Sequence, residues 1–220
     1  MVALKTFNNL KPERRQEIID TCLEEFSVHD YESASLSDII KKLALAKGSF
    51  YRYFESKQAL YLYLLNFCLE KRLEHDKAVV NNTQDDFFNL YTAHFEARIQ
   101  FEKKHPFPSA FLHNLLRQKT VPELGDIQLL AKKRIVELMK PRILEDIKKG
   151  RIREDLDPDL LAFIMAQTQM LITDYISYKY GLDYCKHLLN KKSTVLQDKD
   201  IVQNGKKIIE ILKTGFQSKK

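Results

Sequence analysis

The segment from Ser35 to Lys57, SLSDIIKKLALAKGSFYRYFESK, constrains the fold of this chain more than any other part of it. It predicts two short helices joined by a tight turn. The first helix carries its apolar residues on one face and starts with Ser35 and Asp38 in a pattern that resembles a capping box. In the second helix, Phe50 and Phe54 lie four residues apart, which predicts a buried stripe. The segment is therefore a candidate helix-turn-helix.

The opposite face of the second helix carries polar groups suited to DNA. Gly48 and Arg52 point away from the apolar stripe, flanked by Lys47, Ser49, Tyr51 and Tyr53. Cationic and hydroxyl groups bind phosphates, and a glycine lets the backbone come close to a ligand. On these residues alone, an ordinary helical hairpin in an all-α protein is the alternative.

The distribution of charge matters more than its total. The net charge is +6, but residues 186–220 hold nine Lys and only three acidic residues, so this excess lies at the C-terminal end. Within 35–57 there are five basic residues and two acidic ones. This local excess is the charge that favours a nucleic-acid partner.

From Arg15 to Leu64 the chain resembles the DNA-binding head of the TetR family of transcriptional regulators. The matching pieces are a helix with Ile18, Ile19, Cys22, Leu23 and Phe26, the Ser35 helix start, the KGSFYRYF segment, and the Ser56-Lys57…Leu60 entry to a long helix. The rest of the chain resembles the family in size, helical character and helix order.

Three positions depart from the family pattern. Ala44 stands where the family usually turns on Gly, Ala46 replaces the usual Ser or Thr cap, and Asp30 stands where Gly commonly ends the first helix. Asp tolerates left-handed backbone geometry, so the change at Asp30 is mild. Loss of a side-chain cap at Ala46 is expected to cost about 1 kcal/mol.

The resemblance implies roles for individual residues. It implies phosphate contacts from Ser35, Tyr51, Tyr53 and Lys57, and an approach to base edges by Ser37, Lys47, Gly48, Ser49 and Arg52. An arginine can read guanine through two acceptors or hold a phosphate, and both roles stay open for Arg52.

The whole chain predicts an all-α fold of about nine helices. Six Gly and six Pro are few for 220 residues, which favours long helices. We expect a helix-turn-helix domain over residues 1–55 and a helical ligand-binding and dimerisation domain over 56–220. Beyond the motif, the predicted helices are 12–28, 56–80, one starting near Asp85 and Asp86 and ending at 104, one ending at 118, then 122–150, 157–180 and 198–216. A break is expected at 81–83, and Pro141 is expected to kink or split its helix.

Several classes of function find no support in the sequence. No apolar run reaches the roughly 20 residues that span a bilayer, and no secretion signal is predicted, so we expect a cytoplasmic protein without a membrane partner. Cys22, Cys68 and Cys185 are predicted to be reduced thiols. There is no CxxC or HxxxH spacing, nucleophile elbow, phosphate-binding Gly loop or dinucleotide fingerprint. We therefore predict no metal, no cofactor, no catalytic residue and no enzyme activity.

The resemblance implies a homodimeric regulator, a repressor by expectation, that binds a near-palindromic operator in double-stranded DNA and responds to an unknown small-molecule effector. A pocket with His94, His113 and Gln169 is predicted for the effector. The last two long helices carry more apolar positions than one buried stripe each requires, which predicts a four-helix dimer interface. The alternatives are a helical enzyme whose active site assembles through space, and a protein-interaction scaffold without DNA binding.

Overall fold

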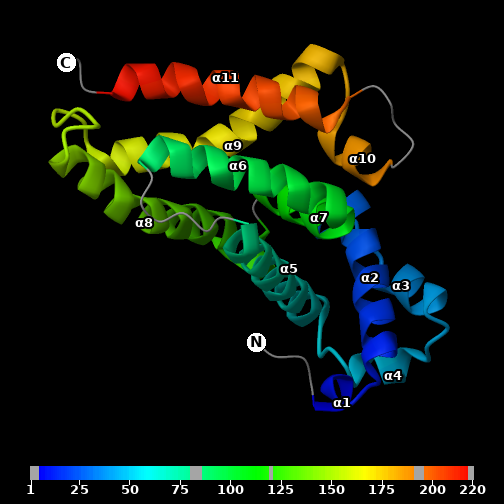
Figure 1. Ribbon diagram of the computed structural model, residues 1–220. Coiled ribbons are helices and arrows are strands. Elements are labelled where there is room, and N and C mark those ends of the chain that lie inside the picture. The colour runs from blue at the N-terminus through cyan, green and yellow to red at the C-terminus, as the bar shows by residue number, and fades with distance from the viewer. Residues whose placement is uncertain (1–4, 80–85, 119–120, 191–195, 218–220) are drawn as a thin grey trace. The chain divides into compact units, whose positions relative to one another are not determined.

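The computed structural model describes residues 5–79, 86–118, 121–190 and 196–217, and it confirms the all-α class (Figure 1). These residues form eleven α-helices and one 3-10 turn, and the β-structure among them is limited to an isolated bridge between Ile152 and Gln217. About nine helices were expected. The two short helices that sequence reasoning missed are α1 (Lys5–Asn8) and α10 (Tyr184–Leu189).

The other helices are α2 (Pro12–Val28), α3 (Leu36–Lys42), α4 (Lys47–Tyr51), α5 (Lys57–Val79), α6 (Phe87–Lys104), α7 (Pro106–Arg117), α8 (Ile127–Lys148), α9 (Pro158–Tyr180) and α11 (Asp198–Phe216). The long helices α2, α5, α6, α9 and α11 lie close to their predicted bounds. Local signals explain this success. Proline occupies the first turn of α2, α7 and α9, where its missing N–H costs nothing. Asp157 also caps α9 by accepting from the backbone of Asp159.

The predicted helix over 122–150 is wrong at its start. Pro122–Leu124 forms the 3-10 turn η1, and α8 begins only at Ile127. Gly125 separates them with φ +60°, a conformation that a helix cannot continue through.

Pro141 lies inside α8, which continues through it as one element. The break predicted at 81–83 lies outside the described residues, as do Val80 and Asp85. Asp86 accepts from the backbone N–H of Asn89 and so caps α6 as expected.

The chain divides into two compact units. Unit 1 comprises residues 1–74 and 104–126, and unit 2 comprises residues 75–103 and 127–220. Unit 1 extends past the first four helices because α7 packs along α2. A functional division at residues 55 and 56 stays a prediction.

Aromatic rings fill the core of unit 1. Phe26 on α2 meets Tyr61 on α5 with ring centroids 5.2 Å apart, and Tyr61 lies 4.9 Å from Phe111 on α7. A second cluster surrounds Phe7 of α1, whose ring is 4.8 Å from that of Phe54. Edge-to-face and tilted pairs of this kind stabilise beyond their buried area. The small helix α1 is thereby attached to the end of the helix-turn-helix segment.

In unit 2, α9 packs against both α8 and α11 (Figure 1). The contact between α6 and α11 is especially close at Gly205. A Cβ added there would lie 2.2 Å from the ring of Phe95, so this position requires glycine. Two buried polar groups are paired across the unit: Tyr91 donates to the Met165 carbonyl at 2.8 Å, and the Asp146 carboxylate accepts from the Phe87 N–H at 2.6 Å.

Across the described residues, no helix combines the length and apolar character that crossing a membrane requires.

Candidate nucleic-acid interface

Two hydrogen bonds of Ser35 fix the start of α3. Ser35 accepts through Oγ from the Asp38 N–H at 3.2 Å, which is the N-cap that the sequence predicts. The Ser35 backbone N–H in turn donates at 2.8 Å to the carboxylate of Glu25, a buried residue of α2. The Ser35 hydroxyl therefore already has a hydrogen-bond partner within the protein, whereas Ser37, the second residue of α3, is exposed.

The turn between α3 and α4 depends on Ala44. Its φ is +51°, and it is the one residue other than glycine with positive φ in the described part of the chain. This conformation places Cβ close to the following carbonyl and costs an L-residue about 1–2 kcal/mol. Arg14 supports the turn by donating from Nη2 to the Leu43 carbonyl at 2.9 Å. The turn is therefore left-handed at a residue other than glycine.

Helix α4 is shorter than expected. It ends at Tyr51, so Phe54 lies beyond it, and the backbone N–H groups of Tyr53 and Phe54 both donate to the Phe50 carbonyl. Phe50 and Phe54 are nevertheless buried, as predicted. Ala46 precedes the helix with extended geometry and no side-chain cap, so the first N–H groups of α4 lack a side-chain acceptor from the cap position.

The exposed face of α4 carries most of the predicted DNA-contacting side chains. Lys47, Gly48, Tyr51 and Arg52 are exposed, and Ser49 is half-buried with its hydroxyl 3.4 Å from Arg52 Nη2. A Cβ built on Gly48 meets nothing within 4 Å, so the fold itself leaves room for a side chain there. Tyr53 is half-buried, with its ring 5.9 Å from that of Phe7.

Lys57 lies at the first position of α5 and is engaged within the fold. Its Nζ donates to the carbonyls of Ala34 at 2.6 Å and Glu32 at 3.1 Å, and it lies 5.1 Å from the centre of the Tyr31 ring. Partial burial lowers the pKa of this ammonium. Because an ammonium has three N–H groups, one stays available for another acceptor.

The sequence interpretation of Asp30 needs correcting. Asp30 is not in the left-handed region, which among the described non-glycine residues only Ala44 adopts. Its carboxylate instead accepts from the backbone N–H of Ser33 at 2.9 Å and from the Ser33 hydroxyl, and these bonds hold its pKa below the usual value. An aspartate fits this loop because it forms a local side-chain-to-backbone turn.

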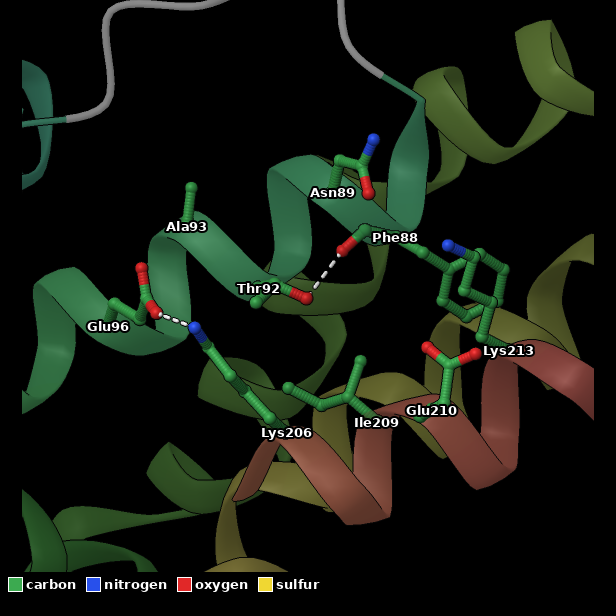
Figure 2. Close-up of a pocket in the computed structure, with 9 residues that line it drawn as sticks. All are labelled: Phe88, Asn89, Thr92, Ala93, Glu96, Lys206, Ile209, Glu210 and Lys213. Carbon is green, nitrogen blue, oxygen red and sulfur yellow. Dashed lines mark hydrogen bonds and ion pairs between the residues drawn. The ribbon is translucent and has the colours of Figure 1, made fainter. Parts of the chain in front are cut away.

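The residues predicted for an effector pocket belong to different units, and the pocket stays a prediction. His94 on α6 and Gln169 on α9 belong to unit 2, whereas His113 on α7 belongs to unit 1. Unit 2 contains a cavity of about 340 Å³ between α6 and α11, which none of the three lines (Figure 2). Phe88 and Ile209 contribute apolar surface to this cavity, and an ion pair joins Glu96 to Lys206 beside it.

The cysteines of the chain are free thiols. Cys22 and Cys68 are buried free thiols, as expected, and burial raises the pKa of both. Cys185 is a half-buried free thiol. In the described ranges, no three His, Cys, Asp or Glu side chains gather as a metal-binding group.

A capped helix, a tight turn and a second helix with exposed basic and hydroxyl groups define a helix-turn-helix DNA-binding domain. Residues 18–64 match the family described as bacterial regulatory proteins, tetR family. This match over the helix-turn-helix segment, together with the relatives described next, supports a TetR-family transcriptional regulator.

Individual relatives agree with this assignment. The HTH-type transcriptional regulator YuxN of Bacillus subtilis (strain 168) is 28% identical over 124 residues, which is 55% of this chain and 40% of that protein. The biofilm operon icaADBC negative transcriptional regulator IcaR of Staphylococcus aureus (strain Newman) is 25% identical over 150 residues, covering 68% of this chain and 80% of IcaR. The crystal structure of a TetR-family regulator from Chloroflexus aurantiacus covers both chains fully, with a TM-score of 0.78 and 25% identity.

Proposed function

We propose that this protein is a homodimeric, ligand-responsive repressor that binds a near-palindromic operator in double-stranded DNA. The observation that carries the proposal is the exposed face of α4, where Lys47, Tyr51 and an open Gly48 lie on a helix packed through Phe50. Tyr51 contacts the Phe50 ring edge-to-face, and in the described part of the chain neither the Lys47 ammonium nor the Tyr51 hydroxyl forms a hydrogen bond or ion pair. The name of IcaR, a negative regulator, supports repression over activation.

Within this proposal the DNA contacts divide into two groups. Lys47, Gly48, Ser49, Ser37 and Arg52 approach base edges in the major groove, and Tyr51 and Tyr53 hold phosphates. Ser35 and Lys57, which are already bonded within the fold, act mainly by holding the α3 start and the loop before it in place. Lys57 keeps one N–H for a phosphate at the N-terminus of α5, where free backbone N–H groups also favour an anion.

The dimer is proposed to form through α9. Five large side chains of this helix are exposed at helical spacing: Leu160, Phe163, Leu171, Tyr175 and Tyr178. A lone subunit would leave this stripe in water, which is unfavourable for a contiguous apolar surface. Helix α11 adds Ile211, which is 71% exposed, whereas Ile201 and Ile209 are buried in the core of their own subunit. Two heads related by a two-fold axis would reach successive major grooves about 34 Å apart.

Regulation requires that the effector bind one dimer geometry better than the other, because a ligand shifts an equilibrium only by its difference in affinity. Binding in unit 2 would favour a spacing of heads that no longer fits the operator. A regulator of this kind acts on the chromosome and thus in the cytoplasm.

A mobility-shift titration with duplex DNA at several salt concentrations tests the proposal. The dimer should bind with an affinity that falls steeply as salt increases, because phosphate contacts release counterions. Absence of a salt-dependent shift with every duplex would favour a helical enzyme or a protein-interaction scaffold instead.

A further inference from the structure

Helix α4 is too short to keep its own geometry. It spans only Lys47–Tyr51, and Ala46 gives it no side-chain cap. A helix of this length is unstable unless tertiary contacts hold it. Its start follows the turn at Ala44, whereas the position of its end, where Arg52 and Tyr53 follow, depends on what packs there. Both of these residues belong to the proposed DNA contacts.

Helix α1 supplies a hydrogen bond to that end. It lies at the same end of unit 1 as α4 (Figure 1), and its Thr6 hydroxyl donates to the Arg52 carbonyl. The last carbonyls of a helix lack a donor within that helix, and Thr6 supplies one from outside it. Because Thr6 is exposed, water can replace its hydroxyl as a donor at little cost in stability. We therefore expect this bond to fix where the Arg52 backbone lies more than to stabilise the fold.

The second contact from α1 is aromatic. Phe7 is fully buried, and its ring lies 5.9 Å from that of Tyr53. The same ring is 4.8 Å from that of Phe54 and 5.5 Å from that of Tyr63 on α5. Phe7 thereby joins the segment after α4 to a helix of 23 residues. Since the half-buried Tyr53 ring packs against Phe7, the direction of its hydroxyl depends on that contact.

Both contacts come from outside the segment that matches the family. The match begins at residue 18, and α1 ends at Asn8. The match therefore assigns no role to Thr6 or Phe7. A binding group that is already held in its bound orientation loses less conformational freedom when the complex forms, and this raises the affinity.

We propose that Thr6 and Phe7 are positioning residues of the DNA interface. Thr6 holds the Arg52 backbone and Phe7 holds the Tyr53 ring, so that both side chains meet the duplex in a fixed orientation. This inference rests on the DNA-binding function proposed above. Thr6 and Phe7 act on affinity through Arg52 and Tyr53, not through contacts of their own with the DNA.

Thr6→Val tests the hydrogen bond, because valine keeps nearly the same shape without the donor. Fluorescence anisotropy of the full-length protein measures affinity for a labelled duplex carrying the site that the wild type selects from a random pool. Thr6→Val should bind this duplex about fivefold more weakly. Thr6→Ser keeps the hydroxyl and should bind like the wild type. Unchanged affinity of Thr6→Val would overturn the role of Thr6.

A double-mutant cycle with Arg52 separates positioning from a general effect on the fold. Arg52→Ala removes the guanidinium but keeps the carbonyl that accepts from Thr6. In this background Thr6→Val should weaken binding by less than about twofold, because the side chain that it positions is gone. An equal loss in both backgrounds would show that Thr6 does not act through Arg52.

The same cycle applies to the aromatic contact. Tyr53→Phe keeps the ring that packs against Phe7 and removes only the hydroxyl. Phe7→Leu should weaken binding by about fivefold in the wild type and by less than about twofold in Tyr53→Phe. Equal losses in the two backgrounds would overturn the role of Phe7 in orienting Tyr53. If urea unfolding shows that Phe7→Leu does not fold, the Thr6 variants decide the test.

Asn9→Ala is the matched control, since this exposed side chain follows α1 directly. It should leave the affinity unchanged. A loss as large as that of Thr6→Val would mean that this part of the chain contacts DNA itself, which would overturn the positioning role.

The failure of this inference differs from the failure of the proposed function. A wild type that binds the selected duplex, with Thr6→Val and Phe7→Leu at full affinity, would overturn this inference alone. A wild type that binds no duplex would overturn the DNA-binding function and this inference with it.

Discussion

The Tyr31 hydroxyl donates a 2.6 Å hydrogen bond to the carboxylate of Glu123, joining the loop that precedes α3 to the turn η1 that follows α7. Gln118 strengthens the same connection, because its Oε1 accepts from the Tyr31 backbone N–H and its Nε2 donates to the Tyr61 hydroxyl. Lys57 Nζ lies over the Tyr31 ring, 5.1 Å from its centre. The loop that positions the helix-turn-helix is therefore held by residues distant in sequence, all within unit 1.

Tyr31→Phe should lower the free energy of unfolding by about 1 kcal/mol, because the Glu123 carboxylate loses a partly buried partner while the ring contacts remain. Thermal or urea unfolding measures this loss. Tyr51→Phe on the exposed side of α4 is the matched control and should change stability little. Equal stability of Tyr31→Phe and wild type would show that the bond to Glu123 adds nothing.

Gly48→Ala should separate folding from DNA binding. The fold leaves space for the added methyl, and alanine favours an exposed helix over glycine by about 0.5–1 kcal/mol, so the free energy of unfolding should rise slightly. Operator affinity should nevertheless fall, because the new Cβ keeps the backbone away from the DNA. Fluorescence anisotropy with a labelled duplex measures the affinity. Unchanged affinity would remove Gly48 from the interface.

Ala44→Gly should stabilise the protein by about 1 kcal/mol, since glycine adopts φ +51° without the steric cost that alanine bears there. Urea unfolding gives the change. Gly205→Ala is the opposite control: its new Cβ would clash with Phe95, and the variant should be markedly less stable. A destabilising Ala44→Gly would mean that the turn does not carry the predicted strain.

Arg52→Ala distinguishes base reading from phosphate binding. If Arg52 reads a guanine, the variant should lose preference at one operator position, at a cost of roughly 1–3 kcal/mol there. Binding to duplexes substituted one position at a time measures this. A uniform loss across all sequences, with a salt slope shallower by about 1 per subunit, would assign Arg52 to phosphate instead.

Leu171→Glu should dissociate the dimer. Leu171 is 53% exposed in the subunit, so a glutamate carboxylate at this position costs little in the monomer. In the proposed α9 interface the same carboxylate would be buried next to its symmetry mate or other apolar groups, which is strongly unfavourable. Light scattering at micromolar concentration should give the mass of a monomer. Gln203→Glu on the exposed face of α11 is the control and should stay dimeric. A dimeric Leu171→Glu would place the interface elsewhere.

Local signals explain what the sequence predicted well. Ser35 and Asp157 mark helix starts through hydrogen bonds within one turn, and Pro12 marks one through its fixed φ. Phe50 and Phe54 follow a simple helical period, so each of these signals can be read from neighbouring residues. The hydrogen bonds from Tyr31 to Glu123 and from Tyr184 to Glu102 could not be predicted in this way. Each joins residues more than eighty positions apart, and such pairing depends on tertiary packing that no local pattern records.

The most direct test of the central claim is selection of bound sites from random duplexes by the full-length protein. The dimeric helix-turn-helix account predicts enrichment of a near-palindromic sequence whose half-site centres lie about 10 base pairs apart or a multiple of that spacing, with Gly48→Ala failing to enrich it. Recovery of unrelated sequences without two-fold symmetry, or of the same site with Gly48→Ala at equal efficiency, would contradict the account.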